Sequence, residues 1–396
     1  MIGLYVQIEI GLFEKYFNKT RGEIMTQVPY QHGLQRINTG GLQSLWMETP
    51  GYCNLACPYC FACGGEPLRT EELLTFEDIE KILVEAKKMG MDVFGIPGAG
   101  EPLLPINREL TMRIIRKCAE LQVFVALFTT GEFITPDLAA ELYALPVEIL
   151  LKCNSFNPEL QDAFVSDASR GRIIHGFGDK RNRTLELLMQ VGFNDETACM
   201  KDFGRKSRLA LVTSIMTDEK CLSNLDEIVS IFRFCREHNI IFDCDSVLKR
   251  GRGASCNLHT QDELYRDKLL ELQKIDREEY GNDWNITQSY AGGPACDRYA
   301  HHLYVTQYGE IFPCIGATGV KLGNICDVSL QQAWESREMQ IIHARQYGGK
   351  CGKECANFAE GKCNPCLGRR TVNLTNEFLL TNGYVETIGC WNFRKK

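Results

Sequence analysis

The stretch "GYCNLACPYCFACGG", residues 51–65, holds four cysteines, Cys53, Cys57, Cys60 and Cys63. It directly follows "SLWMET" at 44–49, a short β-branched and aromatic run that predicts a strand. The chain has 19 cysteines, and we expect it to be in the reducing cytoplasm. In a reducing compartment such cysteines are metal ligands more readily than disulfides. We therefore interpret this segment as a metal-binding loop at the end of a strand.

The spacing of the cysteines indicates which metal centre the loop suits. A structural zinc site usually combines two C-x2-C pairs separated by a dozen or more residues, whereas these thiols crowd into one loop. A [4Fe–4S] cluster accepts three thiolates from such a loop. Two triplets compete, Cys53/Cys57/Cys60 and Cys57/Cys60/Cys63. We favour the first, because it begins just after the carboxyl end of the strand, where the active sites of parallel barrels gather.

Composition and charge narrow the class of protein. The chain has 396 residues, 44% of them hydrophobic, which is enough for a large domain and a smaller one. Its net charge of −7 argues against a broad basic surface for nucleic acid, so a small molecule or a peptide is the expected substrate. No run of 18 apolar residues occurs, and the first residues make a poor signal peptide. We expect a cytoplasmic protein without a membrane span.

Strand patterns alternate with helix patterns along most of the chain. Strands are predicted at 44–49, 91–97, 123–130, 147–154, 208–216 and 240–248. Helices are predicted at 75–90, 107–120, 136–144, 181–191, 223–238 and 262–276, and the polar stretch 156–180 is predicted to be an insertion. Crossover helices imply parallel strands. The predicted fold class is α/β, a partial (β/α)6 parallel barrel at 44–280 after an N-terminal extension at 1–43.

The segment "CNLACPYC" within the cysteine loop resembles the cluster motif of radical S-adenosylmethionine (SAM) enzymes. The resemblance implies that Cys53, Cys57 and Cys60 hold three irons of a [4Fe–4S] cluster. It also implies that the fourth iron binds the amino and carboxylate groups of SAM, and that Tyr59 packs near the adenine. Cys63 lies outside the motif and is expected not to be a ligand.

The end of the second strand, "IPGAGEP" at 96–102, supports this resemblance. Glycine lets the backbone come close to a ligand, and a carboxylate attracts an ammonium group. Gly98, Gly100 and Glu101 are therefore expected to bind the SAM ammonium. The segment is similar to the GGEP motif of the family, with Ala99 in place of one glycine.

The ends of the third and fourth strands provide further candidate SAM contacts. "FTTG" at 128–131 matches another position of the family and includes Thr130. The fourth strand ends "KCNSF", where alternation places Lys152 and Asn154 on one face and Cys153 on the face that meets helices. We expect Lys152, Asn154 and Ser155 to point at the ribose or carboxylate of SAM.

From about residue 280 the alternation stops, and Gly- and Cys-rich segments predict a second, smaller domain at 281–396. The spacing of Cys296, Gly309 and Cys314 resembles the start of a SPASM domain, and Gly309 is expected to form a hairpin turn. The resemblance implies two auxiliary clusters, one held by Cys351, Cys355, Cys363 and Cys390, the other by Cys296, Cys314 and Cys366. Zinc knuckles are the alternative, because C-x3-C and C-x2-C pairs also suit zinc.

Charged residues gather at the end of the sixth strand. Asp243 and Asp245 alternate with apolar neighbours, so they share a face that is expected to be the barrel interior. They are the candidate catalytic bases. "KRGRG" at 249–253 follows and is either an anion-binding loop or a solvated basic turn.

The resemblance implies that one electron cleaves SAM to methionine and a 5′-deoxyadenosyl radical, which removes a hydrogen atom from the substrate. Auxiliary clusters favour net oxidation or cross-linking, with a flavodoxin- or ferredoxin-like protein as reductant. We predict a peptide or protein substrate. A dehydrogenase or rearranging enzyme for a small metabolite, such as a sugar or cyclitol, is the close alternative. A non-catalytic iron–sulfur electron carrier is the alternative of another class, and it leaves the barrel and the "GAGEP" loop unexplained.

Overall fold

The structure is a computed structural model, and it describes residues 41–167, 170–195, 207–218, 222–248, 250–256, 262–284, 298–344 and 375–382. The predicted N-terminal extension lies outside these ranges apart from residues 41–43. Of the predicted auxiliary ligands, Cys314 lies within them. The others lie outside the described residues: Cys296, Cys351, Cys355, Cys363, Cys366 and Cys390.

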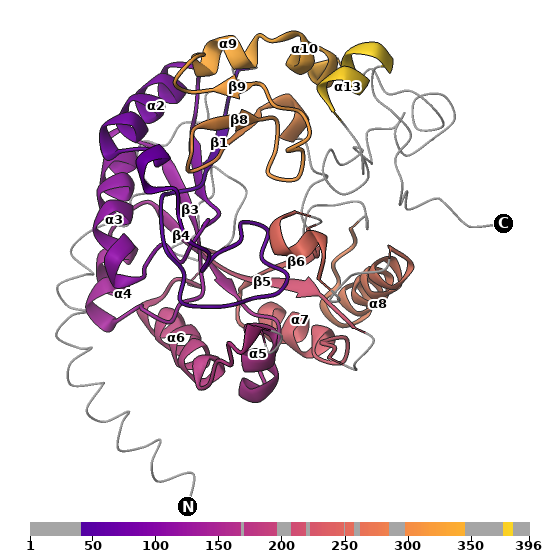
Figure 1. Cartoon of the computed structure of the whole chain (residues 1–396). Coiled ribbons are helices and arrows are strands. Elements are labelled where there is room, and N and C mark those ends of the chain that lie inside the picture. Colours follow the sequence, from indigo (N-terminus) through magenta and orange to yellow (C-terminus); the bar gives the residue numbers. More distant parts are fainter. Residues whose placement is uncertain are drawn as a thin grey trace, which may run out of the picture.

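Six parallel strands form the centre of the fold (Figure 1). They are β1 (Ser44–Met47), β2 (Val93–Ile96), β3 (Phe124–Thr129), β4 (Val147–Lys152), β5 (Leu209–Ile215) and β6 (Ile241–Ser246). Each strand pairs in parallel with the next strand along the chain. Every strand lies inside its predicted range, and the predicted α/β class with a parallel sheet is confirmed. In a parallel sheet of this order, all six carboxyl ends reach the same edge.

Helices follow one another around the outside of the curved sheet (Figure 1). They are α2 (Phe76–Lys88), α3 (Pro105–Glu120), α4 (Pro136–Tyr143), α5 (Pro158–Phe164), α6 (Phe177–Val191), α7 (Ile228–Glu237) and α8 (Asp262–Tyr280). Helix α2 begins at a capping box between Thr75 and Asp78, as predicted. No helix in the described ranges is long and apolar enough to cross a membrane.

Helix α5 lies in the stretch 156–180, which the sequence reading predicted to be a polar insertion. The side chain of Asn157 accepts hydrogen bonds from the N–H groups of Glu159 and Leu160, and Pro158 occupies the first turn. Both features are typical helix starts. The helix is seven residues long, which is too short for a periodic apolar face to be visible in the sequence.

The first strands of the C-terminal segment extend the same sheet. Strand β7 (His302–Val305) pairs in parallel with β1, and β8 (Glu310–Phe312) and β9 (Gly323–Asn324) follow as antiparallel neighbours. Gly309 has φ 80° in the turn between β7 and β8, so the predicted hairpin is confirmed. Short helices complete the segment: α9 (Leu330–Trp334), α10 (Arg337–His343) and α13 (Asn376–Asn382). A domain boundary near residue 280 stays a prediction.

The two faces of the sheet differ in chemistry. The face toward the helices is apolar and belongs to the main core, with Ile149, Leu211 and Phe242 among its residues. The inner face holds a small apolar cluster that includes Leu150 and Val212. Toward the carboxyl ends of β4, β5 and β6, the inner side chains are polar and include Lys152, Ser214 and Asp245.

Candidate functional site

The cysteine loop after β1 brings three thiols together. Cys53, Cys57 and Cys60 are partly buried, and they lie close enough that the charge of Cys60 acts on both of the others. Gly64 closes the loop: its N–H donates to Cys60 Sγ at 3.2 Å. A Cβ at position 64 would lie 3.2 Å from Cys53 Cβ and 3.5 Å from Cys60 Sγ. A side chain at position 64 would therefore crowd the side chains of Cys53 and Cys60.

Burial disfavours the thiolate form of two of these thiols when no metal is bound. Burial raises the pKa of the Cys53 thiol to about 12 and also raises the pKa of the Cys57 thiol. A metal ion removes such protons outright, because its charge stabilises the thiolate. Two protein cations, Lys152 and Arg252, act on Cys57 in the same direction. Soft thiolate donors in a buried loop fit iron–sulfur chemistry.

Two kinds of metal centre differ in how closely their ligands must converge. In the part of the chain that the structure describes, no three His, Cys, Asp or Glu side chains converge closely enough to hold one metal ion. A zinc site needs that convergence, with each ligand about 2 Å from the metal. The thiolates of a four-iron cluster stand apart on its corners. Cys63 ends the loop with φ 54°, and its carbonyl accepts from Glu66 N at 3.1 Å; its exclusion from the ligands stays a prediction.

The segment 96–102 packs directly against the cysteine loop. A Cβ on Gly100 would lie 2.3 Å from the carbonyl oxygen of Tyr52, so the two backbones touch there. The N–H of Glu101 donates to that same oxygen at 2.9 Å. Asn107 Nδ2 donates to the carbonyls of Tyr52 and Glu101, each at 2.8 Å, and Asn107 Oδ1 accepts from Tyr52 N at 3.1 Å. One buried amide therefore holds the two loops together.

Replacing Asn107 with alanine is expected to lower the free energy of unfolding by about 2 kcal/mol, because backbone groups of Tyr52 and Glu101 lose a buried partner. Asn107 is 5% exposed, whereas its neighbour Ile106 is 69% exposed. Ile106→Ala is the matched control and should change stability by less than about 0.5 kcal/mol. Anaerobic urea unfolding measures both variants. Equal losses of stability in the two variants would mean that the Asn107 side chain does not hold the two loops together.

Glu101 also joins the ends of β2 and β3. Its carboxylate accepts from Thr129 Oγ1 at 2.5 Å, from Thr130 N at 2.8 Å and from Leu103 N at 3.1 Å. Burial raises the pKa of Glu101, and the hydrogen bonds from Thr129 and Thr130 oppose this shift. The structure thus brings four predicted SAM-binding residues to one place beside the cysteine loop: Gly98, Gly100, Glu101 and Thr130. Their contact with SAM stays a prediction.

Tyr59, Lys152 and Asn154 form a polar group between the cysteine loop and β4. Asn154 is fully buried. Its Nδ2 donates to the Tyr59 hydroxyl at 2.7 Å, and its Oδ1 accepts from Ser214 N at 2.9 Å. Lys152 Nζ donates to Ser214 Oγ at 2.8 Å and lies 5.7 Å from the centre of the Tyr59 ring. Asn154 therefore fixes the position of the tyrosine that was predicted to pack near the adenine.

The other residues at the end of β4 face the helices. Leu151 and Cys153 belong to the main core, as the alternation predicted. Ser155 Oγ donates to Glu227 Oε2 at 3.0 Å and accepts from Asn157 N at 2.9 Å. The Ser155 hydroxyl therefore holds the turn between β4 and α5, and its contact with SAM stays a prediction.

Asp243 and Asp245 lie on the inner face of β6, opposite the buried side chains that alternate with them. The register of β5 and β6 places Asp245 beside Ser214. Burial lowers the pKa of Lys152, and the negative charge of Asp243 is among those that oppose this shift. The structure thus brings both aspartates to the polar side of the sheet. Their role as catalytic bases stays a prediction.

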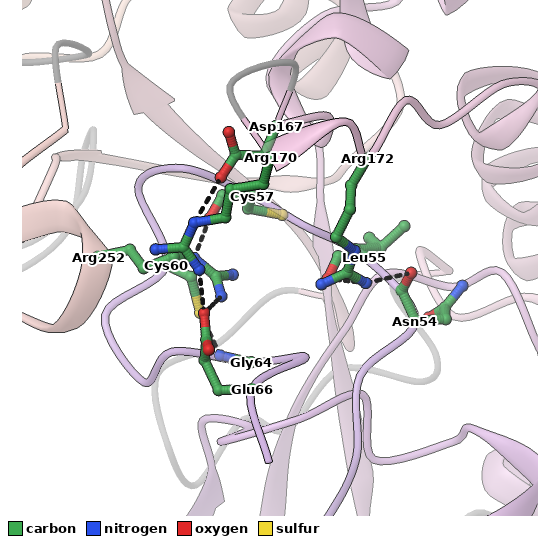
Figure 2. A network of polar contacts seen from close by, with 10 residues as sticks. All are labelled: Asn54, Leu55, Cys57, Cys60, Gly64, Glu66, Asp167, Arg170, Arg172 and Arg252. Atoms are coloured by element: carbon green, nitrogen blue, oxygen red, sulfur yellow. Dashed lines mark hydrogen bonds and ion pairs between the residues drawn. The ribbon is translucent and has the colours of Figure 1, made fainter.

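Two residues that support the site, Asn107 and Arg252, were not predicted from the sequence. Asn107 left no signal, because a polar residue in the first turn of a helix is ordinary. Arg252 lies in the "KRGRG" segment, for which an anion-binding loop and a solvated turn were the alternatives. It is 9% exposed, and its Nε donates to the Cys57 carbonyl at 3.0 Å (Figure 2). The interpretation as a solvated turn is therefore wrong for Arg252.

Comparison with known families agrees with this geometry. Residues 47–204 match the radical SAM superfamily, and residues 296–367 match an iron–sulfur cluster-binding domain, SPASM. The first match contains the cysteine loop and the ends of β2, β3 and β4. The second contains most of the predicted auxiliary ligands: Cys296, Cys314, Cys351, Cys355, Cys363 and Cys366.

Individual relatives are distant. The chain is 23% identical to the AdoMet-dependent heme synthase of Methanosarcina barkeri in an alignment of 334 positions, which covers 78% of this chain and 86% of that protein. The structure resembles Streptococcus suis SuiB bound to S-adenosylmethionine, with a TM-score of 0.57, 17% identity and coverage of 81% and 72% of the two chains. It also resembles anSMEcpe with bound AdoMet, with a TM-score of 0.59, 17% identity and coverage of 87% and 93%. The two structures support the fold.

The two family matches and the cysteine loop lead to one assignment. The predicted cofactors, [4Fe–4S] clusters and SAM, are confirmed by the two matched domains. Iron–sulfur chemistry therefore replaces the zinc alternative for the C-terminal cysteines. This chain belongs to the radical SAM superfamily and carries a C-terminal SPASM domain.

Proposed function

We propose that this protein is a radical SAM oxidoreductase that removes hydrogen from a peptide substrate, leading to net oxidation or cross-linking. The observation that carries the proposal is the meeting of the cysteine loop, the Glu101 loop and the polar end of β4 at one edge of the parallel sheet. An electron carrier without catalysis would need only the cysteines. It would have no use for the buried contacts that join all three segments.

In this proposal the side chains have separate tasks. Cys53, Cys57 and Cys60 would hold the SAM-binding cluster. The reduced cluster, when bound there, supplies the electron that cleaves SAM to methionine and a 5′-deoxyadenosyl radical, which takes a hydrogen atom from the substrate. The surrounding residues position the reacting carbon and exclude water, which is the main contribution of a protein to such chemistry.

The predicted SAM-binding residues support orientation of the cofactor. Glycine backbone at 98 and 100 offers close approach for the ammonium group beside the buried carboxylate of Glu101. Tyr59 offers an aromatic face, and Lys152 offers a cation for the SAM carboxylate. The inner-face aspartates, Asp243 and Asp245, are placed to accept a proton from an oxidised substrate.

The SPASM domain favours a net oxidation. Auxiliary clusters held by this domain would supply an acceptor for the second electron of a two-electron oxidation. An enzyme that returned the hydrogen atom to its substrate would not need that acceptor. The first electron requires an external donor, for which a flavodoxin- or ferredoxin-like protein is the proposed partner.

Two observations favour a peptide substrate. Among the structures that share this fold, one is SuiB bound to the precursor peptide SuiA, and another is anSMEcpe with bound AdoMet and Cp18Cys peptide. The heme synthase relative favours a second candidate, oxidation of a small molecule, because its name denotes the synthesis of a metabolite and it matches 78% of this chain. We prefer the peptide, because two of the structures that share this fold contain a bound peptide.

The reaction class is testable by mass spectrometry. Candidate substrates come from neighbouring genes, where a short open reading frame provides a peptide and metabolic genes provide a small molecule. With substrate and a reductant under anaerobic conditions, each event should yield one 5′-deoxyadenosine and a product about two mass units lighter, because two hydrogens are lost. The control is the same mixture without SAM. An unchanged product mass with SAM recovered intact would indicate an isomerising enzyme, and a product heavier by a methyl group would indicate a methyltransferase.

A further inference from the structure

The segment that follows β6 lies against the backbone of the cysteine loop. Gly251 has φ 55°, and a Cβ there would lie 2.4 Å from the Phe61 carbonyl oxygen and 2.7 Å from that of Cys60. A Cβ on Gly253 would lie 3.0 Å from the Tyr59 carbonyl oxygen. These close approaches need glycine on both sides of Arg252. They place the arginine directly beside the cluster ligands.

Arg252 spans the cysteine loop from its middle to its end. Its Nε donates to the Cys57 carbonyl at 3.0 Å, and its Nη1 donates to Glu66 Oε1 at 3.2 Å. Figure 2 shows this guanidinium between Cys57 and Glu66, where Arg170 contacts the same carboxylate oxygen. The Arg252 side chain is 8% exposed, whereas those of Glu66 and Arg170 are 40% and 53% exposed. The buried member of this network is therefore the one that touches a predicted ligand residue.

The charge of Arg252 is only partly compensated by Glu66. That carboxylate is shared with Arg170 and reaches solvent, which screens exposed charges strongly. The buried guanidinium is screened less. Arg252 thus places a positive charge next to Cys57, one of the residues that would hold the cluster.

We propose that Arg252 is a positioning residue of the SAM-binding cluster, which holds the Cys57 segment in place and raises the reduction potential of the cluster through its buried positive charge. The proposal rests on the proposed ligand set Cys53, Cys57 and Cys60. Reduction adds one negative charge to the cluster, and a nearby cation stabilises the reduced form. The hydrogen bond from Arg252 fixes the distance over which this charge acts.

The test is a potentiometric titration of the iron-loaded protein without SAM, followed by electron paramagnetic resonance. The triple variant Cys53→Ala/Cys57→Ala/Cys60→Ala gives the auxiliary signals alone, and subtraction isolates the SAM-binding cluster. At the potential that half-reduces the wild-type cluster, Arg252→Gln should lower the ratio of reduced to oxidised cluster about tenfold. This ratio corresponds to a potential about 59 mV lower for a one-electron couple.

Two further variants separate charge from packing. Arg252→Lys keeps the charge but loses the planar fork, so it should restore most of the potential while the iron content falls below that of the wild type. Glu66→Gln removes the compensating carboxylate, so it should shift the potential upward, opposite to Arg252→Gln. Arg170→Gln is the matched control, because Arg170 contacts the same carboxylate but is exposed and does not touch the cysteine loop ligands; its potential should shift far less than that of Arg252→Gln.

A wild-type potential in iron-loaded Arg252→Gln would overturn the proposal, as would equal shifts in the Gln and Lys variants. If Arg252→Gln failed to hold its cluster, the absence of an upward shift in Glu66→Gln would overturn it instead. Retention of the SAM-sensitive signal in Cys57→Ala would refute the ligand set, and with it both the proposed function and the role of Arg252. Loss of that signal in Cys57→Ala, together with a wild-type reduction potential in Arg252→Gln, would refute the arginine proposal alone.

Discussion

Replacing Cys57 with alanine is expected to abolish the cleavage of SAM. Cys57 is the central thiol of the three that the loop brings together, and the charges of both of the others act on it. A cluster with one thiolate missing loses a corner ligand. Chromatography of 5′-deoxyadenosine, after incubation with dithionite and SAM, measures the loss.

The matched control for this result is Cys63→Ala, which should leave SAM cleavage close to the wild-type level. Cys63 lies at the end of the same loop, where its backbone closes a turn onto Glu66. The triple variant of Cys53, Cys57 and Cys60 should retain about eight iron atoms if both auxiliary sites are four-iron clusters. Activity that is lost in Cys63→Ala and kept in Cys53→Ala would show that the other triplet holds the cluster.

Gly100→Ala should reduce the rate of SAM cleavage by about a hundredfold, because a misplacement of about 1 Å in an active site has that effect. The new Cβ would lie 2.3 Å from the Tyr52 carbonyl oxygen and 2.7 Å from that of Gly51. Both obstacles are backbone, so the Glu101 loop or the start of the cysteine loop must move. The same 5′-deoxyadenosine assay reports the rate, and iron analysis reports whether the cluster is still bound.

Gly281→Ala is the control for the general effect of adding a methyl group to a glycine. Position 281 has φ 70° but nothing within 4 Å of its Cβ. The control should therefore cost about 1 kcal/mol of stability through backbone strain, with SAM cleavage unchanged. If Gly100→Ala cleaved SAM at the wild-type rate, the contact between the two loops would have no role in placing the cofactor.

The strands and most helices were predictable because their signals are local. Each strand of the parallel sheet is a short apolar run between turn residues, and the observed strands lie within the predicted ranges. The capping box of Thr75 and Asp78 marks the start of α2 from two residues three positions apart. Helix α5 was not predicted, because its seven residues are too few for a periodic pattern of apolar residues to be recognised.

The candidate cluster ligands were also predictable from the sequence, because all three lie within residues 53–60 and follow a strand directly. Their spacing alone restricted the metal centre, and the family match to residues 47–204 agrees with that restriction. The glycines of "GAGEP" carried a similar local signal. Their physical reason became clear only in the structure, where Gly100 touches the backbone of Tyr52.

By itself, the sequence of this protein determined the order of strands and helices, the thiol spacing and the family, since each depends on neighbours along the chain. The tertiary structure decided which distant groups meet: Asn107 reaches Tyr52 across 55 positions, and Arg252 reaches Cys57 across 195. It also decided that β7 pairs with β1. No local pattern encodes these contacts, because the packing of helices on the sheet brings the strand ends to one edge, and only there do the loops that follow them touch.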